Sequence, residues 1–367
     1  MRVGIVVLSV KTGGSERRLA KLVQYLAGRG RHSYYLLAPE HLLRSLRDEG
    51  TLPSEGLELR SMGPDPGGEH LERLAATHYT AFLAWRRLLT AALAEAEVVG
   101  PTDVVHFLNP VSYFMAPLPF RRHAVVEAVG SGEGWHVELM LRQAAERGAA
   151  VNCLSRSIQH SLARGMGPDM VRRLHVSPGS MVGVPDAPAV TKQRRVVFLG
   201  RLDRVKNPLL FAAAIGLVAK KRRDFRVSIS ADGSLRGAVD SLFRASGVAD
   251  LVDWNEDQPP GPSFAQSLVA VTLQAVDNYP RQSLLEAMTC RTAIVASDVG
   301  LTHRLVSPDT GLLVPLEAPA VAAAVESLLA DPERATRMGE AARALVRREH
   351  RVDRYADYVE QLYGLVA

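Results

Sequence analysis

The sequence predicts an α/β protein built from two Rossmann-like domains. Short apolar runs rich in β-branched residues alternate with helical patterns along the 367 residues, as in parallel sheets that are covered by helices. The chain opens with a strand, a glycine turn and a helix, and this pattern restarts near residue 192 after a segment rich in proline and alanine. The length also suits two domains of about 180 residues each.

The first domain is expected over residues 1–184. Residues 2–9 have the pattern of a buried strand, and the turn at 12–15 leads into a helix that ends near Ala27, with apolar residues at spacings of three and four. Further apolar runs predict strands in chain order at 33–38, 103–108, 123–129, 150–155 and 174–179. A helix is expected from Ser155 to about Gly165.

The second domain is expected over residues 192–350, after a linker at 184–192. Its predicted strands lie at 195–200, 225–230, 267–273 and 293–297. Its predicted helices lie at 208–221, 318–329 and 332–349, and a last helix is expected from residue 352.

The composition indicates a soluble protein of a reducing compartment, which predicts a cytoplasmic location. Hydrophobic residues make up 47% of the chain, yet no apolar run reaches the roughly 18 residues of a membrane span. Cys153 and Cys290 lie far apart and lack metal-ligand spacing. The net charge of +5 suits an anionic ligand or a membrane surface, but we favour a general arginine- and alanine-rich composition as its cause.

Two segments about eighty residues apart supply the parts of an anion site. Arg201 and Lys206 follow a predicted strand, at the end where open α/β sheets bind ligands. A helix that begins near Pro280 would direct its free N–H groups and its positive dipole end at an anion. Glu286, in the same helix, would accept hydrogen bonds from ribose hydroxyls. Together these residues predict a site for a nucleoside diphosphate.

The second half of the chain resembles the nucleotide-sugar-binding half of the retaining glycosyltransferases of the glycogen-synthase-like superfamily, glycosyltransferase family four. The matching segments lie in order at 200–206, 284–288, 295–300 and 310–315. The resemblance implies the GT-B fold, in which two Rossmann-like domains face a cleft and the last helix, here about 352–367, crosses back to the first domain. It also implies a metal-independent hexosyltransferase-like enzyme without a further cofactor.

In this family the donor is a nucleoside diphosphate sugar, and the first domain binds most of the acceptor, which we expect to be a small molecule, a glycan or a lipid. By resemblance, Arg201 and Lys206 bind the diphosphate and assist catalysis. Asn278 stands where the family signature has its first glutamate, eight positions before Glu286. By resemblance it is expected to act in catalysis by contacting the transferred sugar near its reacting face, and Asp277 is the alternative. Tyr279, Ser283, Leu284, Gly300 and Thr302 are expected to line the donor pocket.

In the first domain, Gly13 and Gly14 are expected to bring free N–H groups close to the ligand. Many relatives have a histidine after the strand at 123–129, but this chain has a glycine-rich loop there. We expect Gly130, Ser131 and Glu133 of that loop to face the sugar or the acceptor, with Ser131 in a catalytic role. His106 is another polar group near a strand end.

Two other functions remain open: a sugar phosphorylase of the same fold, and a degenerate sugar-nucleotide-binding protein without catalysis. The second is motivated by Asn278 and by the missing histidine. Nucleic acid is not an expected partner, because no interleaving of aromatic and basic residues and no zinc spacing accompany the charge. The basic helix residues Arg17, Arg18, Lys21, Arg29 and Arg31 could meet anionic lipid, but we favour a solvated helix face over peripheral membrane contact.

Overall fold

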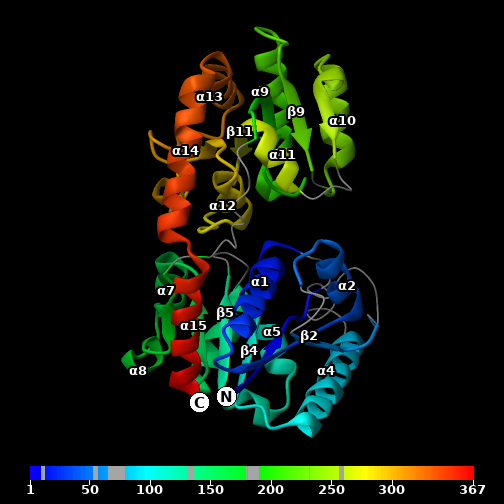
Figure 1. Ribbon diagram of the computed structural model, residues 1–367, viewed down its shortest axis with the longest axis vertical. Coiled ribbons are helices and arrows are strands. Elements are labelled where there is room, and N and C mark those ends of the chain that lie inside the picture. The colour runs from blue at the N-terminus through cyan, green and yellow to red at the C-terminus, as the bar shows by residue number, and fades with distance from the viewer. Residues whose placement is uncertain are drawn as a thin grey trace. The chain divides into compact units, whose positions relative to one another are not determined.

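The computed structural model describes residues 1–9, 13–52, 57–64, 79–129, 135–178, 180, 190–230, 232–255 and 260–367. The chain divides into two compact units, which are coloured along the sequence in Figure 1. Unit 1 comprises Met1–Gly183 and Val352–Ala367, and unit 2 comprises Val184–Arg351. Each unit contains one parallel sheet.

The sheet of unit 1 has the strand order β3-β2-β1-β4-β5-β6-β7. Its strands are β1 (Arg2–Val6), β2 (Ser33–Ala38), β3 (Glu58–Ser61), β4 (Val104–Phe107), β5 (Ala124–Ala128), β6 (Ala150–Cys153) and β7 (Leu174–Val176). The order of the strands reverses between β1 and β4, so the loops that follow these two strands flank the topological switch point of the sheet.

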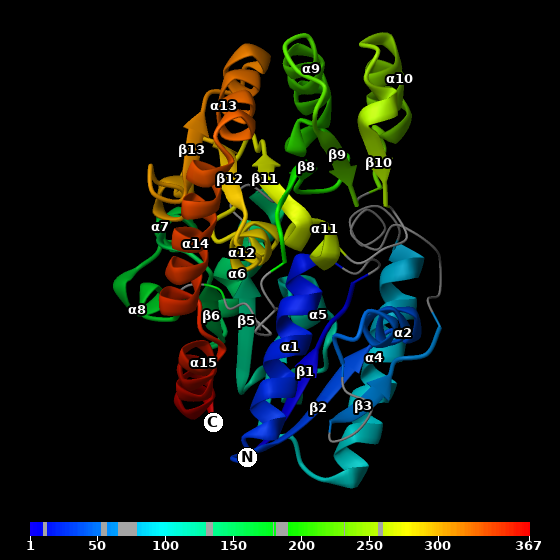
Figure 2. The ribbon, with the colours of Figure 1, turned by 45° about the horizontal axis from the view of Figure 1, so that its top comes forward.

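The helices of unit 1 are α1 (Gly14–Gly28), α2 (Glu40–Asp48), α4 (Tyr79–Val99), α5 (Pro110–Met115), α6 (Trp135–Glu146), α7 (Arg156–Ala163), α8 (Pro168–Val171) and α15 (Val352–Val366), with a 3₁₀ turn at Leu118–Arg121. Figure 2 shows α15 beside α1, and the two helices pack together. Helices α4, α5 and α6 pack in succession. The C-terminal residues therefore complete the fold of unit 1.

The sheet of unit 2 has the strand order β10-β9-β8-β11-β12-β13. Its strands are β8 (Gln193–Phe198), β9 (Arg226–Ile229), β10 (Val252–Trp254), β11 (Ser267–Thr272), β12 (Ala293–Ser297) and β13 (Gly311–Val314). Its helices are α9 (Pro208–Ala219), α10 (Arg236–Ala245), α11 (Pro260–Gln266), α12 (Gln282–Thr289), α13 (Ala318–Ala330) and α14 (Pro332–Glu349), with 3₁₀ turns at Arg204–Lys206, Ala249–Leu251 and Thr302–Arg304. Here the switch point lies between β8 and β11.

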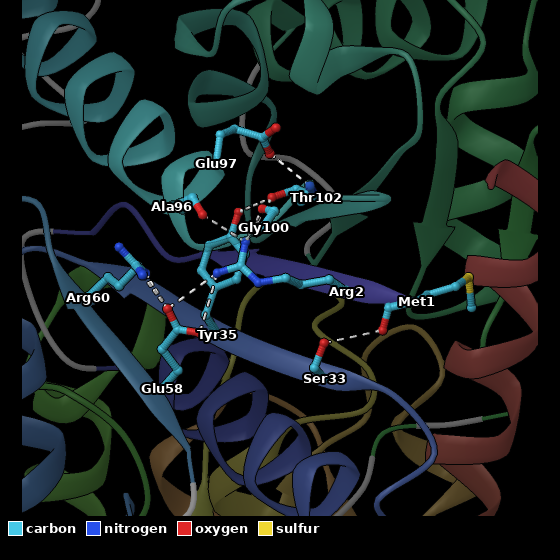
Figure 3. A network of polar contacts seen from close by, with 10 residues as sticks. All are labelled: Met1, Arg2, Ser33, Tyr35, Glu58, Arg60, Ala96, Glu97, Gly100 and Thr102. Carbon is cyan, nitrogen blue, oxygen red and sulfur yellow. Dashed lines mark hydrogen bonds and ion pairs between the residues drawn. The ribbon is translucent and has the colours of Figure 1, made fainter.

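Arg2, at the amino-terminal end of strand β1, connects several elements of unit 1, as Figure 3 shows. Its Nη1 donates to the carbonyl oxygens of Ala96 (2.9 Å) and Gly100 (2.7 Å), at the end of α4. Its Nη2 bonds the carboxylate of Glu58 on β3, and the guanidinium lies 4.6 Å from the ring centre of Tyr35 on β2. One side chain on β1 therefore joins two strands to the C-terminal end of a helix, where a cation is favourable.

A buried polar network joins α1, the sheet and α15. Arg18 is 2% exposed and its Nη2 donates to Glu127 on β5 at 2.6 Å. Glu127 also accepts hydrogen bonds from His106 on β4 and Asn152 on β6, while the hydroxyl of Tyr355 on α15 accepts from Arg18. Burial alone would raise the pKa of Glu127, but the charge of Arg18 and these hydrogen bonds outweigh it and lower the pKa.

This network corrects the expectation of a solvated basic face on α1. Arg17 bonds Glu49 at 2.6 Å, and Arg29 bonds Asp357 and Glu360 of α15, so several of these cations are used within unit 1. His106 has a structural role, because its two ring nitrogens lie 2.8 Å from the hydroxyl of Tyr363 and 3.0 Å from Glu127. Among the residues that the structure describes, we find no helix that combines the length and the apolar composition needed to cross a bilayer.

Candidate functional site

Three loops of unit 2 meet at the carboxyl edge of its sheet. They follow β8, β11 and β12, which are neighbouring strands, and they span residues 199–207, 273–281 and 298–304. Asn207 Nδ2 donates to the carbonyl oxygen of Leu273 at 3.1 Å, which joins the first loop to the second. The hydroxyl of Ser297, at the end of β12, both accepts from the N–H of Gln274 and donates to its carbonyl oxygen. The loops around the switch point thus support one another.

Lys206 is held in the first of these loops. Gly200 has a φ of 131°, and a Cβ there would lie 3.3 Å from Cγ and Cδ of Lys206, so the glycine gives the lysine stem room to cross the backbone. Lys206 is half-buried. Burial, together with the positive charges of Arg281 and Arg201, lowers the pKa of its amine to about 8.

Arg201 lies at the outer side of this loop. Its side chain is 70% exposed, and its Nε lies 3.1 Å from a carboxylate oxygen of Asp203. The sequence predicted the same diphosphate-binding role for both cations, but in the structure Arg201 is exposed and Lys206 is half-buried. The charge of Arg201 nevertheless reaches Lys206, because it contributes to lowering the lysine pKa.

Helix α12 follows β11, the strand beside β8, and the charge of its N-cap residue, Arg281, acts on Lys206. The helix begins at Gln282, two residues after Pro280, and Arg281 is its N-cap residue without a side-chain cap. The N–H of Leu285 donates to the carbonyl oxygen of Arg281 at 3.0 Å, so the N–H groups of residues 282–284 precede the first bond within the helix. The side chain of Leu284 is 1% exposed, so any contact of this residue with a ligand would be made by its backbone N–H group.

Arg281 is a further candidate site residue, which the sequence analysis did not name. It is 6% exposed and its Nη1 bonds the hydroxyl of Thr272, at the end of β11. Its Nε is buried and has no hydrogen-bond partner in the described part of the chain. Burial lowers the pKa of its guanidinium to about 10, although the negative charge of Asp277 opposes this effect. An arginine in the helix-start segment was the available signal, but sequence alone cannot show its burial.

Asp277 and Gly300 join the second loop to the third. Asp277 Oδ1 accepts from the N–H groups of Tyr279 (3.2 Å) and Leu301 (3.4 Å). Gly300 has a φ of 57°, and a Cβ there would lie 2.2 Å from Cγ of Asp277, which only glycine avoids. Asp277 therefore organises the loop around Asn278, which is half-buried.

The remaining predicted residues of unit 2 surround this loop and helix. Glu286 is half-buried on α12, and its Oε1 accepts from Nε2 of Gln282 at 3.4 Å. Ser283 is half-buried in the first turn of the same helix. Thr302 is buried, and its hydroxyl donates to the carbonyl oxygen of Val299 at 2.7 Å, so its donor is used within its own loop.

In unit 1, Gly13 and Gly14 lie at the start of α1 after β1, next to that sheet's switch point. The N–H of Gly13 donates to Glu16 Oε2 at 2.9 Å, so a carboxylate already occupies this helix end. Gly130, Ser131 and Glu133 lie outside the described residues. Among the described residues, no three His, Cys, Asp or Glu side chains gather as ligands of a metal ion would.

Comparison with known proteins supports the resemblance found in the sequence. Residues 193–331 match the family model of the glycosyl transferases group 1. The D-inositol 3-phosphate glycosyltransferase of Paenarthrobacter aurescens (strain TC1) is 32% identical over 126 residues, which are 32% of this chain and 31% of that protein. The alpha-D-kanosaminyltransferase of Streptomyces kanamyceticus is 29% identical over 174 residues, which are 46% of this chain and 45% of that protein. The aligned segments thus cover less than half of either relative.

A solved structure extends the comparison to the whole chain. HepE from Anabaena, solved in complex with UDP and glucose, matches 100% of this chain and 100% of its own chain, with a TM-score of 0.74 at 16% identity. At 16% identity, this structural similarity shows the fold alone. The predicted α/β class with two Rossmann-like domains, the GT-B fold, is confirmed, and so is the predicted family resemblance over residues 193–331.

Proposed function

We propose that this protein is a glycosyltransferase that transfers a sugar from a nucleoside diphosphate sugar to an acceptor. The observation that carries the proposal is the meeting of Lys206, Arg201 and the N-terminus of α12 at the switch point of unit 2. Two cations and a set of free N–H groups suit a diphosphate. The glycosyltransferase relatives and the UDP complex of HepE support the same conclusion.

In the proposed reaction the diphosphate leaves with the negative charge that develops on the breaking bond. Lys206 and the N–H groups of Ser283 and Leu284 stabilise that charge, and the exposed Arg201 adds to the field. This set of groups does for the leaving group what a divalent ion does in other enzymes, so the proposal includes metal-independent transfer with retention of configuration. The donor is a co-substrate, and no separate cofactor is included.

The two halves of the donor are assigned to different residues of unit 2. Glu286 lies within the first two turns of α12 and accepts hydrogen bonds from the ribose hydroxyls. Asn278 contacts the transferred sugar, because the neighbouring Asp277 uses Oδ1 to join two loops. Tyr279, Gly300 and Thr302 complete the walls of this part of the pocket.

Unit 1 is proposed to bind the acceptor, a small molecule, a glycan or a lipid, near the loop with Gly130, Ser131 and Glu133. Gly13 and Gly14 complete that side, although the carboxylate of Glu16 at the same helix end disfavours an anionic group against Gly13. A cytoplasmic location is part of the proposal.

The test is donor turnover. The protein is incubated with UDP-, GDP-, ADP- and dTDP-sugars, and release of the nucleoside diphosphate is measured with and without inorganic phosphate. A transferase releases the diphosphate slowly in water and faster once a suitable acceptor is added. Sugar phosphate that forms only with added phosphate would instead identify a phosphorylase, and tight donor binding without turnover with any acceptor would identify a binding protein.

A further inference from the structure

We propose that Arg281 is a third phosphate-binding cation, which binds the diphosphate together with Lys206 and makes the site selective for two linked phosphates over one. The inference rests on the proposed function and deepens it. The sequence predicted the site from the cations Arg201 and Lys206, and Arg281 was not among them. It would contact the substrate directly through its guanidinium.

The position of Arg281 is the first reason. As the N-cap residue of α12, it lies directly before the N–H groups of residues 282–284. Its Nη1 bonds the hydroxyl of Thr272, the last residue of β11, so the end of a central strand orients the guanidinium. An anion bound at this helix end would therefore meet Arg281 without a large rearrangement.

The incomplete pairing of Arg281 is the second reason. The side chain is 6% exposed, yet its Nε has no hydrogen-bond partner among the described residues. The negative charge of Asp277 opposes the lowering of the Arg281 pKa. Oδ1 of Asp277, however, already accepts hydrogen bonds from two backbone N–H groups. A buried cation with an unused donor lowers the stability of the fold, and such groups persist where a ligand uses them.

The crowding of positive charge is the third reason. The charge of Arg281 acts on Lys206 more strongly than that of Arg201 and disfavours the protonated lysine. Two cations that disfavour each other are held together beside a helix N-terminus, which itself favours an anion. A monophosphate presents one phosphate group to both cations, whereas a diphosphate carries more negative charge and presents a separate charged group to each. We therefore assign the pair to the two phosphates.

The test is a comparison of nucleotide affinities by titration calorimetry. Nucleoside, nucleoside monophosphate and nucleoside diphosphate of the preferred base are titrated into the wild-type protein and into Arg281→Gln, Arg281→Lys and Thr272→Val. Arg281→Gln should weaken diphosphate binding roughly 10- to 100-fold, as expected for the loss of a hydrogen bond to a charged group. Its effect on the monophosphate should stay below about threefold, and Arg281→Lys should recover part of the loss.

The melting temperature of the unliganded protein separates a binding role from a structural one. Arg281→Met should melt at the same or a higher temperature than wild type, because it removes an incompletely paired buried charge. The matched control is Arg222→Gln, an arginine of unit 2 that bonds Asp224 outside the site, and it should leave every nucleotide affinity unchanged.

Two results would overturn the inference. One is an unchanged diphosphate affinity in Arg281→Gln while Lys206→Ala loses binding, which leaves the proposed function standing. The other is a large drop in the unliganded melting temperature of Arg281→Met with no recovery of binding in Arg281→Lys, which would make Arg281 a structural residue. If wild type binds none of the nucleotides, the proposed function fails as well.

Discussion

At the scale of single residues, Lys206 predicts a pH dependence of diphosphate binding. The charged groups that act on its amine are Arg281, Arg201 and Asp203, and the pKa is lowered to about 8. A bound diphosphate favours the protonated amine, so affinity should be nearly constant between about pH 7 and 7.5 and should fall by up to about tenfold per pH unit above pH 8. The last proton of a terminal phosphate leaves near pH 6, so the charge of the ligand stays constant across this window.

Titration calorimetry in two buffers of different ionisation enthalpy measures both the affinity and the uptake of a proton. Lys206→Arg is the matched variant, and it should bind the diphosphate with a flat profile between about pH 7 and 9, because a guanidinium remains charged there. The stability of the unliganded protein should change with pH in the opposite direction. Because the pKa of the Lys206 amine is lowered to about 8, its protonated form destabilises the fold below pH 8. This destabilisation should diminish as the pH rises from 8 toward 10.5, the ordinary pKa of a lysine. A flat wild-type profile would contradict the role of Lys206.

Substitution of Asn278 and of Glu286 should distinguish contacts to the transferred sugar from contacts to the ribose. Asn278→Ala should impair transfer while the affinity for the free diphosphate stays within about tenfold, because contacts to the sugar are absent from that complex. Glu286→Ala should weaken both the donor and the free diphosphate, since ribose is common to both. Titrations of the two ligands on the two variants give four affinities. Equal loss of diphosphate affinity in both variants would mean that Asn278 does not face the sugar.

The sequence could propose Arg201, Lys206 and Glu286 as site residues because the spacing of motifs can be read from the chain itself. Arg201, Lys206 and Glu286 were proposed from two motifs around predicted strands and helices, and in the structure the charges of Arg201 and Arg281 both act on Lys206. Arg281 could not be recognised in this way, because its importance depends on burial and on an unused Nε, which only the packing reveals. The sequence likewise does not show which part of Leu284 can meet a ligand, because that depends on the burial of its side chain.

At the scale of secondary-structure elements, the buried network should dominate the stability of unit 1. Arg18 and Arg17 are neighbours on α1, and each bonds a glutamate at 2.6 Å, but only the Arg18–Glu127 pair is almost fully buried. Arg18→Met should lower the free energy of unfolding by about 3–5 kcal/mol, because it leaves Glu127 charged and buried without its cation. Arg17→Met, the matched control, should cost less than about 1 kcal/mol.

Differential scanning calorimetry of the two variants checks this difference. A further variant with both Arg18→Met and Glu127→Gln should recover part of the loss, because no unpaired charge then remains in the interior. Similar small effects for Arg18→Met and Arg17→Met would show that the network does not hold α15 and β5 to α1.

Most buried strands could be predicted from their apolar runs, and β2 and β12 have the predicted bounds. Strand β3, Glu58–Ser61, was not predicted because it is a four-residue edge strand with one apolar residue, Leu59, and β10 has only three residues. The burial of Arg18 and Glu127 was missed because it depends on α15, which lies more than 200 residues away in the sequence. The residue pattern of a segment indicates its secondary structure, but it does not show which distant segment packs against it.

At the scale of the whole molecule, transfer should not need a metal ion. In the proposed reaction the positive charge around the leaving diphosphate comes from Lys206, Arg201, Arg281 and the N-terminus of α12. Turnover of the preferred donor should therefore persist in excess chelator, measured as release of nucleoside diphosphate after removal of metal by dialysis. Complete loss of turnover that magnesium or manganese restores would contradict the proposed mechanism.

The central claim is that unit 2 binds the diphosphate of the donor at the switch point between β8 and β11. The most direct measurement is a crystal structure of the protein with the nucleoside diphosphate of its preferred base. We predict phosphate oxygens at about 2.7–3.2 Å from the N–H groups of Ser283 and Leu284, from Lys206 Nζ and from the guanidinium of Arg281. A diphosphate bound elsewhere, with the first turn of α12 free of contacts, would contradict the account.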